Sequence, residues 1–163
     1  RITVALDRVL AANQAGPGSS LGGIEWGPAT DGNRIYIAEE NFYGIPDPPS
    51  GSTRGSWAAL DPATGNMLWK TYDDTNNAFG GGNALGPVTV TNGVLFAPSM
   101  SGKVRALDAA TGSTLWSRQL PGAAVGGAAV VNGVVYWGNG YAHLGIPGWE
   151  SNNKLYAFSI DGK

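Results

Sequence analysis

The stretch that decides the fold is ALDPATGNMLWK, Ala59–Lys70, because it recurs as ALDAATGSTLWS over Ala106–Ser117. Both copies follow the pattern Ala-x-Asp-x-x-Thr-Gly-x-x-x-Trp, which contains no catalytic nucleophile and no metal-ligand spacing. Self-similarity within one chain is the sequence mark of a repeat architecture, in which each copy builds the same supersecondary unit. The repeated stretch therefore predicts a structural role, and the architecture to which it belongs is the route to a function.

Each copy places a carboxylate, a glycine and an indole at matching positions: Asp61, Gly65 and Trp69 in the first, and Asp108, Gly112 and Trp116 in the second. The Asp side chain can accept hydrogen bonds from backbone amides ahead of it, and the glycine can take the left-handed conformation that closes the turn. The Trp then falls within the next strand, beside a recurring alanine. A large ring next to a small residue suits packing between units, so these residues are predicted to dock one unit on the next.

A second motif accompanies the first. GPVTVTNGVLFA (Gly86–Ala97) resembles GGAAVVNGVVYW (Gly126–Trp137), and GPATDGNRIYIA (Gly27–Ala38) is a third version. Asn-Gly between apolar runs is a strong signal for a β-hairpin, because both residues tolerate positive φ. Each unit thus offers four short strands, and four strands in about forty residues are typical of a β-propeller blade.

The predicted fold is all-β: a partial β-propeller of about three four-stranded antiparallel blades with tryptophan-docking motifs. Val4–Leu10 keeps Ala-Leu-Asp but lacks Thr-Gly, so it is predicted to be a leading strand from a preceding blade. The chain is expected to form a single partial propeller domain. It is divided into residues 1–21 (tail of the preceding blade and linker), 22–75 and 76–120 (two blades) and 121–163 (an incomplete last blade).

Composition limits the function classes. The 163 residues are only 13% charged, with 26 Gly and 10 Pro, which favours many short strands joined by turns. The net charge of −2, with Lys and Arg scattered singly, provides no basic patch, so a nucleic acid is not expected as a partner. Cys is absent, which excludes disulfides, thiolate metal sites and c-type haem attachment. No apolar run approaches about 18 residues, so no membrane span is expected.

With these motifs the sequence resembles the quinoprotein dehydrogenases, propellers that bind pyrroloquinoline quinone, and most of all their polyvinyl-alcohol dehydrogenase branch. The docking pattern and the stretches GGIEWGPATDGNRIYIA, GGNALGPVTVTNGVLFA and NKLYAFS carry the resemblance from Gly22 onward. Members of the family are complete propellers, whereas this chain holds about three blades and lacks the adjacent Cys pair of the alcohol dehydrogenases. The chain is therefore expected to be a C-terminal fragment of such a propeller.

The resemblance implies pyrroloquinoline quinone and Ca²⁺ as cofactors of the intact parent, with or without binding by this chain alone. Innermost strands begin near a propeller's axis, which makes Glu25, Trp26 and Asn83 the cofactor-binding candidates. A Trp can stack on a planar quinone, and Glu or Asn oxygens can ligate Ca²⁺. The alternative is that Trp26 packs between blades and Glu25 is a solvated loop acid. No catalytic residue and no metal ligand is assigned.

The long insertions fall on the face opposite the tight turns, within residues 39–56, 71–82 and 138–153, and long loops on a constant scaffold are common binding sites. Four residues of the last loop are candidates for the rim of the channel: Tyr141, His143, Trp149 and Glu150. The alternative for this loop is a packed lid.

Two further features have a plainer interpretation. The acidic group Glu39, Glu40, Asn41 and Asp47 could form a weak cation site but is more typical of a solvated surface loop. Gly18–Gly22 fits Gly-x-Ser-x-Gly, the nucleophile elbow of hydrolases, but no helix is predicted after it, so an inter-blade linker is expected.

The favoured function is part of a quinone-dependent alcohol dehydrogenase that oxidises secondary alcohols, with this fragment inactive alone. The alternative is a non-catalytic propeller segment that serves as a protein-interaction scaffold, because scaffolds with the same docking motif exist. The expected partners are the remaining propeller blades, as another chain fragment or as further copies, because an open arc leaves apolar sheet faces unpacked. The resemblance implies a periplasmic or secreted location.

Overall fold

The computed structural model describes residues 16–19, 21, 23–76, 82–142, 145, 147 and 149–160. Every regular element in this part of the chain is a strand, which confirms the all-β class, and it contains no helix that could span a membrane. The predicted strand at Val4–Leu10 lies outside the described residues. The strands are β1 (Ala29–Thr30), β2 (Ile35–Glu39), β3 (Ser56–Leu60), β4 (Met67–Tyr72), β5 (Thr89–Thr91), β6 (Val94–Pro98), β7 (Lys103–Asp108), β8 (Thr114–Gln119), β9 (Ala129–Val131), β10 (Val134–Gly138) and β11 (Leu155–Ser159).

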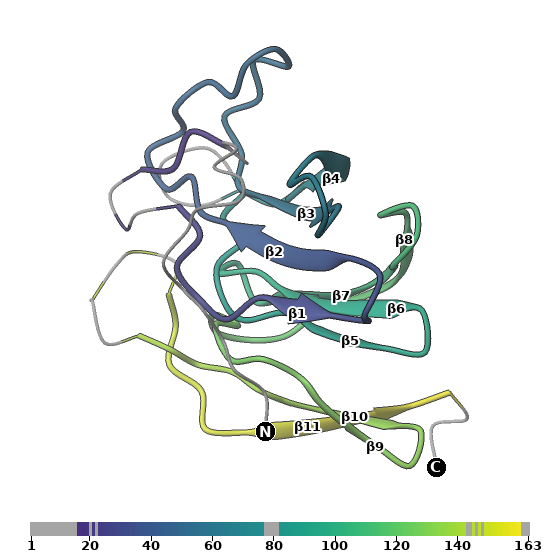
Figure 1. The fold of residues 1–163 in the computed structure, drawn as a ribbon. Coiled ribbons are helices and arrows are strands. Elements are labelled where there is room, and N and C mark those ends of the chain that lie inside the picture. The colour runs from purple at the N-terminus through teal and green to yellow at the C-terminus, as the bar shows by residue number, and fades with distance from the viewer. Residues whose placement is uncertain are drawn as a thin grey trace, which may run out of the picture.

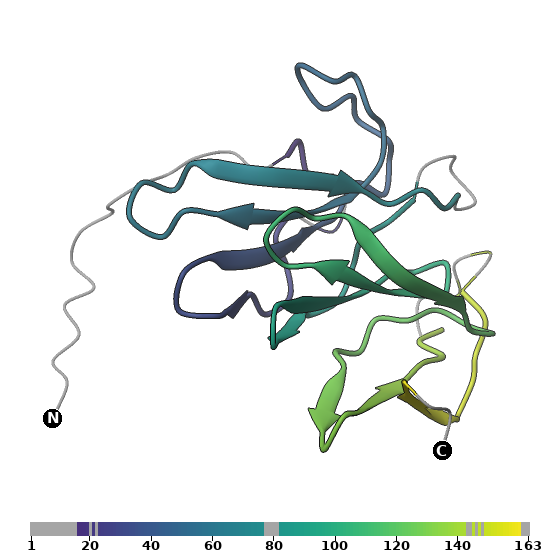
Figure 2. The ribbon, with the colours of Figure 1, turned by 90° about the vertical axis from the view of Figure 1, so that its right-hand side faces the viewer.

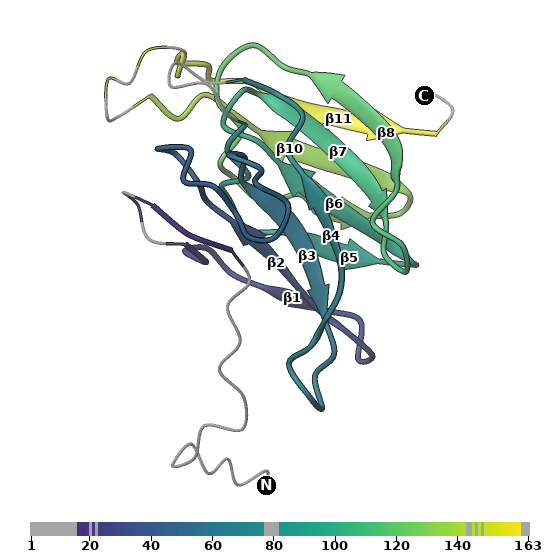
Figure 3. The same ribbon diagram turned by 90° about the horizontal axis from the view of Figure 1, so that it is seen from above.

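These strands form three antiparallel sheets, each built from strands that follow one another in the chain (Figure 1). The first two sheets have the orders β1-β2-β3-β4 and β5-β6-β7-β8, and the third has the order β9-β10-β11. Figures 2 and 3 show the sheets side by side as blades, and the first strands β1 and β5 contact each other. The sheets do not close into a ring, so the fold is the partial propeller that the repeats predict.

The tight hairpins follow from their Asn-Gly pairs. Asn92 and Asn132 have φ values of 48° and 50°, and the glycines after them have φ values of 76° and 75°. Two successive residues with positive φ give the turn whose twist matches that of the flanking strands. In the longer turns, Asp61 and Asp108 each accept a hydrogen bond from the amide two residues ahead, at 2.8 and 2.9 Å.

Trp69 joins the first sheet to the second. It lies opposite Ala59 on the neighbouring strand, and its Nε1 donates a hydrogen bond to the carbonyl of Ala109 at 3.1 Å. Its ring lies against Gly112 so closely that a Cβ there would stand 2.5 Å from Trp69 Cε3. The turn of one blade therefore forms the seat for the indole of the blade before it.

Trp116 occupies the corresponding place in the second sheet, opposite Ala106. Its ring contacts Phe158 of the third sheet, with ring centroids 5.0 Å apart, but the residue remains 38% exposed. The second indole is therefore less enclosed than the first.

Apolar cores fill both spaces between the sheets, and the outward face of the third sheet is open. Tyr36 and Ala59 on the first sheet are buried against the second. Tyr136 and Ala157 pair at the corresponding place on the third sheet, where Ala157 is exposed and the adjacent Leu155 is 70% exposed. A face that is core in the first blade is thus surface in the last.

Candidate functional site

One end of the sheets carries the long connections, which we call the loop face. It comprises residues 40–55 between β2 and β3, 73–76 and 82–88 between β4 and β5, 99–102 between β6 and β7, and the described residues of 139–154 between β10 and β11. In Figure 1 these connections lie on the left and at the top, and the hairpin turns β1–β2, β5–β6 and β9–β10 lie on the right. The alternation of strand directions puts every insertion on the same face, so candidate binding groups are found there.

Two consecutive carboxylates at the end of β2 hold the segment that enters the first blade. Glu39 accepts hydrogen bonds from Gly18 N at 2.9 Å and from Ser56 Oγ at 3.2 Å. Glu40 accepts from Ser19 N at 3.1 Å and from Ser19 Oγ at 2.7 Å. Ser19 is thus bonded to a carboxylate, whereas Ser20, the serine of the Gly-x-Ser-x-Gly pattern, lies outside the described residues.

The interpretation of this acidic group as a solvated surface loop is wrong, because Glu39, Glu40, Asn41 and Asp47 are all buried. The side chains are enclosed because backbone amides, hydroxyl groups and one ammonium group satisfy their oxygens. Burial raises the pKa of Glu39 to about 7, against the lowering effects of its hydrogen bonds with Gly18 and Ser56 and of the Lys70 charge. The pKa of the Glu39 carboxyl group is therefore brought to about neutral pH.

A buried ion pair lies beside this acid, on the face of the first sheet that points away from the second. Lys70 Nζ contacts Asp47 Oδ2 at 2.6 Å, and Tyr72 Oη donates a hydrogen bond to the same oxygen at 2.8 Å. These groups border a cavity of about 420 Å³ that is lined by Gly16, Asp47, Pro48, Pro49, Met67, Lys70 and Tyr72. Because Lys70 and Tyr72 both bond Asp47, the polar groups of the cavity wall already have partners.

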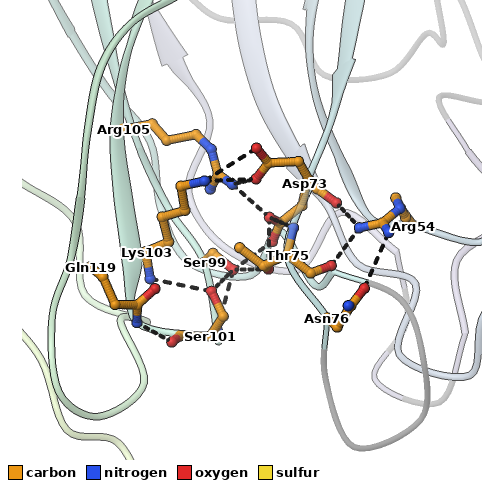
Figure 4. Close-up of polar contacts among 10 residues, drawn as sticks. Arg54, Asp73, Thr75, Asn76, Ser99, Ser101, Lys103, Arg105 and Gln119 are labelled. Atoms are coloured by element: carbon orange, nitrogen blue, oxygen red, sulfur yellow. Dashed lines mark hydrogen bonds and ion pairs between the residues drawn. The ribbon is translucent and has the colours of Figure 1, made fainter.

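A second polar cluster joins the first and second blades at the loop face (Figure 4). Arg105 on β7 donates to Asp73 Oδ1 at 2.9 Å and also contacts Asp74, both of which follow β4. Ser99 donates to the other oxygen of Asp73, and Arg54 Nη1 donates to the carbonyl of Asp73 at 2.8 Å. Two guanidinium groups and one buried carboxylate thus join three connections of the loop face.

The cationic neighbours in this cluster lower the pKa of its exposed acid, Asp74. Partial burial works to raise the pKa of Asp74, but the hydrogen bond from Lys103 and the charge of Arg105 outweigh it, so the pKa lies below its usual value. The Arg105 guanidinium also stacks over the ring of Trp57 at 4.8 Å. Among the described residues, Arg105 Nη1 and Trp57 Nε1 are the buried side-chain polar atoms without a hydrogen-bond partner.

The three cofactor-binding candidates differ in exposure and in their partners. Glu25 and Trp26 precede β1 and are exposed, and desolvation followed by the charge of Glu40 raises the pKa of Glu25. Asn83 is buried, and its amide accepts from Asn41 N at 3.2 Å and donates to the sulfur of Met100 at 3.3 Å. The described residues contain no group of three or more His, Asp or Glu side chains that could hold a metal ion. These residues do not fit a complete quinone or Ca²⁺ site.

The candidates in the last loop divide between core and surface. Trp149 is buried with Phe42, Leu85 and Met100, while Tyr141 and Glu150 are exposed. Tyr141 and Trp149 are in contact, with ring centroids 6.1 Å apart. His143 lies outside the described residues.

Sequence reasoning missed Arg105, Lys70 and Phe42 as organising residues of the loop face. A signal for Arg105 was present, since it stands where the first copy of the repeat has Ala58, at a strand position where a charge needs a buried partner. The arrangement as a whole positions loops, because its carboxylates are bonded to amides, hydroxyls and cations of other connections.

Comparison with known proteins places these observations in a family. The profile of the family PQQ_2, described as Outer membrane protein assembly factor BamB, matches residues 53–162, more than half of the chain. The polyvinylalcohol dehydrogenase of Sphingopyxis sp. (strain 113P3) is 34% identical over 173 residues, which covers 90% of this chain and 26% of that protein. The chain therefore spans about a quarter of the length of the curated relatives it matches.

Solved structures share the fold. A quinohemoprotein alcohol dehydrogenase from Comamonas testosteroni superposes with a TM-score of 0.62 at 21% identity, covering 86% of this chain and 20% of the other. BamB from Moraxella catarrhalis superposes with a TM-score of 0.55 at 16% identity, covering 83% of this chain and 34% of the other. At these identities the likeness is one of fold, and it extends to both an oxidoreductase and an assembly factor.

Proposed function

Because this chain belongs to the PQQ_2 family of quinoprotein-like β-propellers, whose profile is described as Outer membrane protein assembly factor BamB, we propose that it is part of a quinone-dependent alcohol dehydrogenase. The parent protein oxidises secondary alcohols with pyrroloquinoline quinone as electron acceptor and Ca²⁺ as its metal. The observation that carries the proposal is the 34% identity to a polyvinylalcohol dehydrogenase over 90% of the chain. No step is assigned to residues of this chain, because they do not fit a complete cofactor site.

The contribution of this chain is structural within that proposal. It supplies three blades, the docked Trp69 and the loop face, and the remaining blades of the propeller cover its open sheet faces, as another fragment or as further copies. The compartment is the periplasm or the exterior of the cell, which agrees with the outer-membrane process named in the family description.

The test is dye-linked oxidation of a secondary alcohol with added pyrroloquinoline quinone and Ca²⁺, measured in parallel for this chain and for the parent protein that contains it. We expect oxidation and a quinone absorbance band with the parent, and neither with this chain alone. Activity of this chain alone would contradict its role as a part. If the parent binds the quinone but oxidises no alcohol, the proposed alcohol dehydrogenase activity is wrong.

A second candidate is a non-catalytic segment of a protein-interaction scaffold, which the family description itself favours. In that case the parent would neither bind the quinone nor oxidise alcohols. Co-purification of the parent with a defined protein partner, together with failure in the oxidation assay, would decide for this alternative.

A further inference from the structure

Three Asn-Gly pairs occur in the chain, at residues 92–93, 132–133 and 139–140. In such a pair the amide nitrogen of the glycine can attack the side-chain carbonyl carbon of the asparagine, because the glycine carries no Cβ that would obstruct the approach. The attack needs a free carboxamide, a free glycine amide and space in which the backbone can rotate. The structure distinguishes the three pairs by these conditions.

Asn92 and Asn132 lie in the exposed two-residue turns of the β5–β6 and β9–β10 hairpins. Among the described residues, neither their carboxamides nor the amides of Gly93 and Gly133 have a hydrogen-bond partner. A Cβ built on either glycine would meet nothing within 4 Å. The reacting groups of both turns are therefore unrestrained and face open space.

Asn139 and Gly140, in the connection after β10, are held on every side. The Asn139 carboxamide donates to two carbonyl groups of the connection between β8 and β9, and it accepts from Asn152 Nδ2 at 2.9 Å. Gly140 N donates to the carbonyl of Ala123 at 2.7 Å, and a Cβ built on Gly140 would overlap the backbone of Asn152. These hydrogen bonds must break before the glycine nitrogen can reach the carboxamide, so the fold protects this pair.

The reaction at a free pair consumes one water molecule and releases one ammonia molecule. The glycine nitrogen forms a bond to Cγ of the asparagine, the bond between Cγ and Nδ2 breaks, and Nδ2 leaves as ammonia with the proton of the glycine amide. Water then opens the resulting five-membered succinimide at either carbonyl, which gives aspartate or isoaspartate. Nothing is oxidised or reduced, and each event adds one negative charge to a chain whose net charge is −2.

The turn at Asn92 is connected to the seat of Trp69. Gly93 O accepts a hydrogen bond from Ala109 N at 2.9 Å, and Ala109 O accepts one from Trp69 Nε1 at 3.1 Å. Among the described residues, Gly133 O accepts no such bond from a backbone amide. Two hydrogen bonds in series therefore join the first of these turns, but not the second, to a docked indole.

We propose that Asn92 and Asn132 are sites of spontaneous deamidation, that the fold protects Asn139, and that isoaspartate at position 92 loosens the docking of Trp69. Aspartate tolerates the φ of 48° that Asn92 adopts, so this product keeps the turn. Isoaspartate instead routes the backbone through the side-chain methylene, which adds an atom to a turn whose two residues set the geometry of the hairpin. The carbonyl of Gly93 then moves away from the Ala109 amide.

The first experiment follows deamidation with time. The folded chain is kept in mildly alkaline buffer, and peptide mass spectrometry measures the converted fraction at each asparagine. Asn139 should react at least about tenfold more slowly than Asn92 and Asn132, because its hydrogen bonds must break first. In the chain unfolded in urea, the three pairs should react at similar rates, since each is then free.

The second experiment isolates the effect of each turn. Asn132→Gly leaves Asn92 as the reactive turn residue, and Asn92→Gly leaves Asn132, because Gly-Gly fits the same type of turn. At equal conversion to isoaspartate, hydrogen exchange at the Ala109 amide and the Trp69 indole should become about tenfold faster in Asn132→Gly and stay unchanged in Asn92→Gly. Freshly purified Asn92→Asp, which contains aspartate without isoaspartate, should exchange as slowly as the wild type.

Equal rates at all three asparagines in the folded chain would overturn the assignment of the sites, and so would the absence of conversion at Asn92 and Asn132. Unchanged exchange at the Ala109 amide and the Trp69 indole after isoaspartate has formed at position 92 would overturn the coupling. These measurements involve neither quinone nor alcohol, so their outcome is independent of the proposed dehydrogenase activity.

Discussion

At the scale of single residues, the repeats encode contacts rather than chemistry. Gly112 shows this most directly: its φ of 75° is in the left-handed region, and its missing Cβ makes room for the ring of Trp69. The same glycine thus allows the positive φ of its own turn and makes room for the indole of the preceding blade. A side chain at this position would both strain the backbone and clash with Trp69.

The matched pair Gly112→Ala and Gly133→Ala separates these requirements. Gly133 has the same φ of 75° with nothing within 4 Å of a built Cβ, so its substitution costs only backbone strain, about 1 kcal/mol of the free energy of unfolding. Gly112→Ala adds a clash with Trp69 and should cost about 3 kcal/mol. Urea unfolding of both variants measures the difference, and equal losses would mean that the indole is not seated on Gly112.

Glu39 gives a pH dependence with a definite sign. Its pKa of about 7 lies above the ordinary 4.5, so the folded state binds this proton more tightly than the unfolded state does. The stabilisation from the protonated form is complete below about pH 4.5 and is lost as the pH rises to about 7. In the wild type, this loss should lower the urea midpoint as the pH rises from about 4.5 to about 7. We expect the midpoint of Glu39→Gln, which has no proton to lose at this position, to fall less over the same range.

The control is Glu150→Gln, which removes an exposed carboxyl group from another connection of the loop face. This variant should keep the wild-type pH dependence. If Glu39→Gln also keeps the wild-type pH dependence, the protonation of Glu39 does not contribute to the stability of the fold.

At the scale of elements, the strands were predictable and the loop face was not. The Asn-Gly pairs and the Asp-x-x-Thr-Gly turns are local signals, because two or four residues determine the backbone conformation. The partners of Arg105 and Glu39 lie in other connections, at Asp73 and Gly18, and a single sequence does not indicate which loops meet. The departure of Arg105 from the repeat was visible, but its partner was not.

The Arg105 cluster is the element-scale feature whose removal should be most costly. Arg105→Met leaves the buried Asp73 carboxylate without its cation, and breaking a buried pair in this way costs about 3–5 kcal/mol of the free energy of unfolding. Adding Asp73→Asn should recover a large part of the loss, because the uncompensated charge is then gone. A double-mutant cycle in urea measures the coupling, and additive losses would show that the two groups do not interact.

At the scale of the whole molecule, the open arc leaves apolar surface where a closed propeller has core. The outward face of the third sheet carries exposed Val131, Ala157 and Leu155 at positions related to the buried face of the first sheet. The energetic cost of leaving such a face in water scales with its apolar area. The chain therefore has a reason to associate.

Sedimentation velocity of the isolated chain tests this. We expect concentration-dependent association, and Leu155→Lys should shift the distribution toward the monomer by placing a charge on the open face. Tyr43→Lys, on the loop face, is the control and should leave the distribution unchanged. A monomeric wild-type chain at all concentrations would show that the open face needs no partner.

The contact between Phe42 and Trp149 has a consequence for how the arc comes apart. In a simple row of repeats each unit touches only its neighbours, so the array can melt from one end. Here the rings of the first and third blades meet in a cluster that also contains Leu85 of the second blade. When the last blade unfolds, Phe42 of the first blade loses its contact with Trp149. Unfolding at one end therefore destabilises the other end, and we expect the three sheets to unfold together as one cooperative unit.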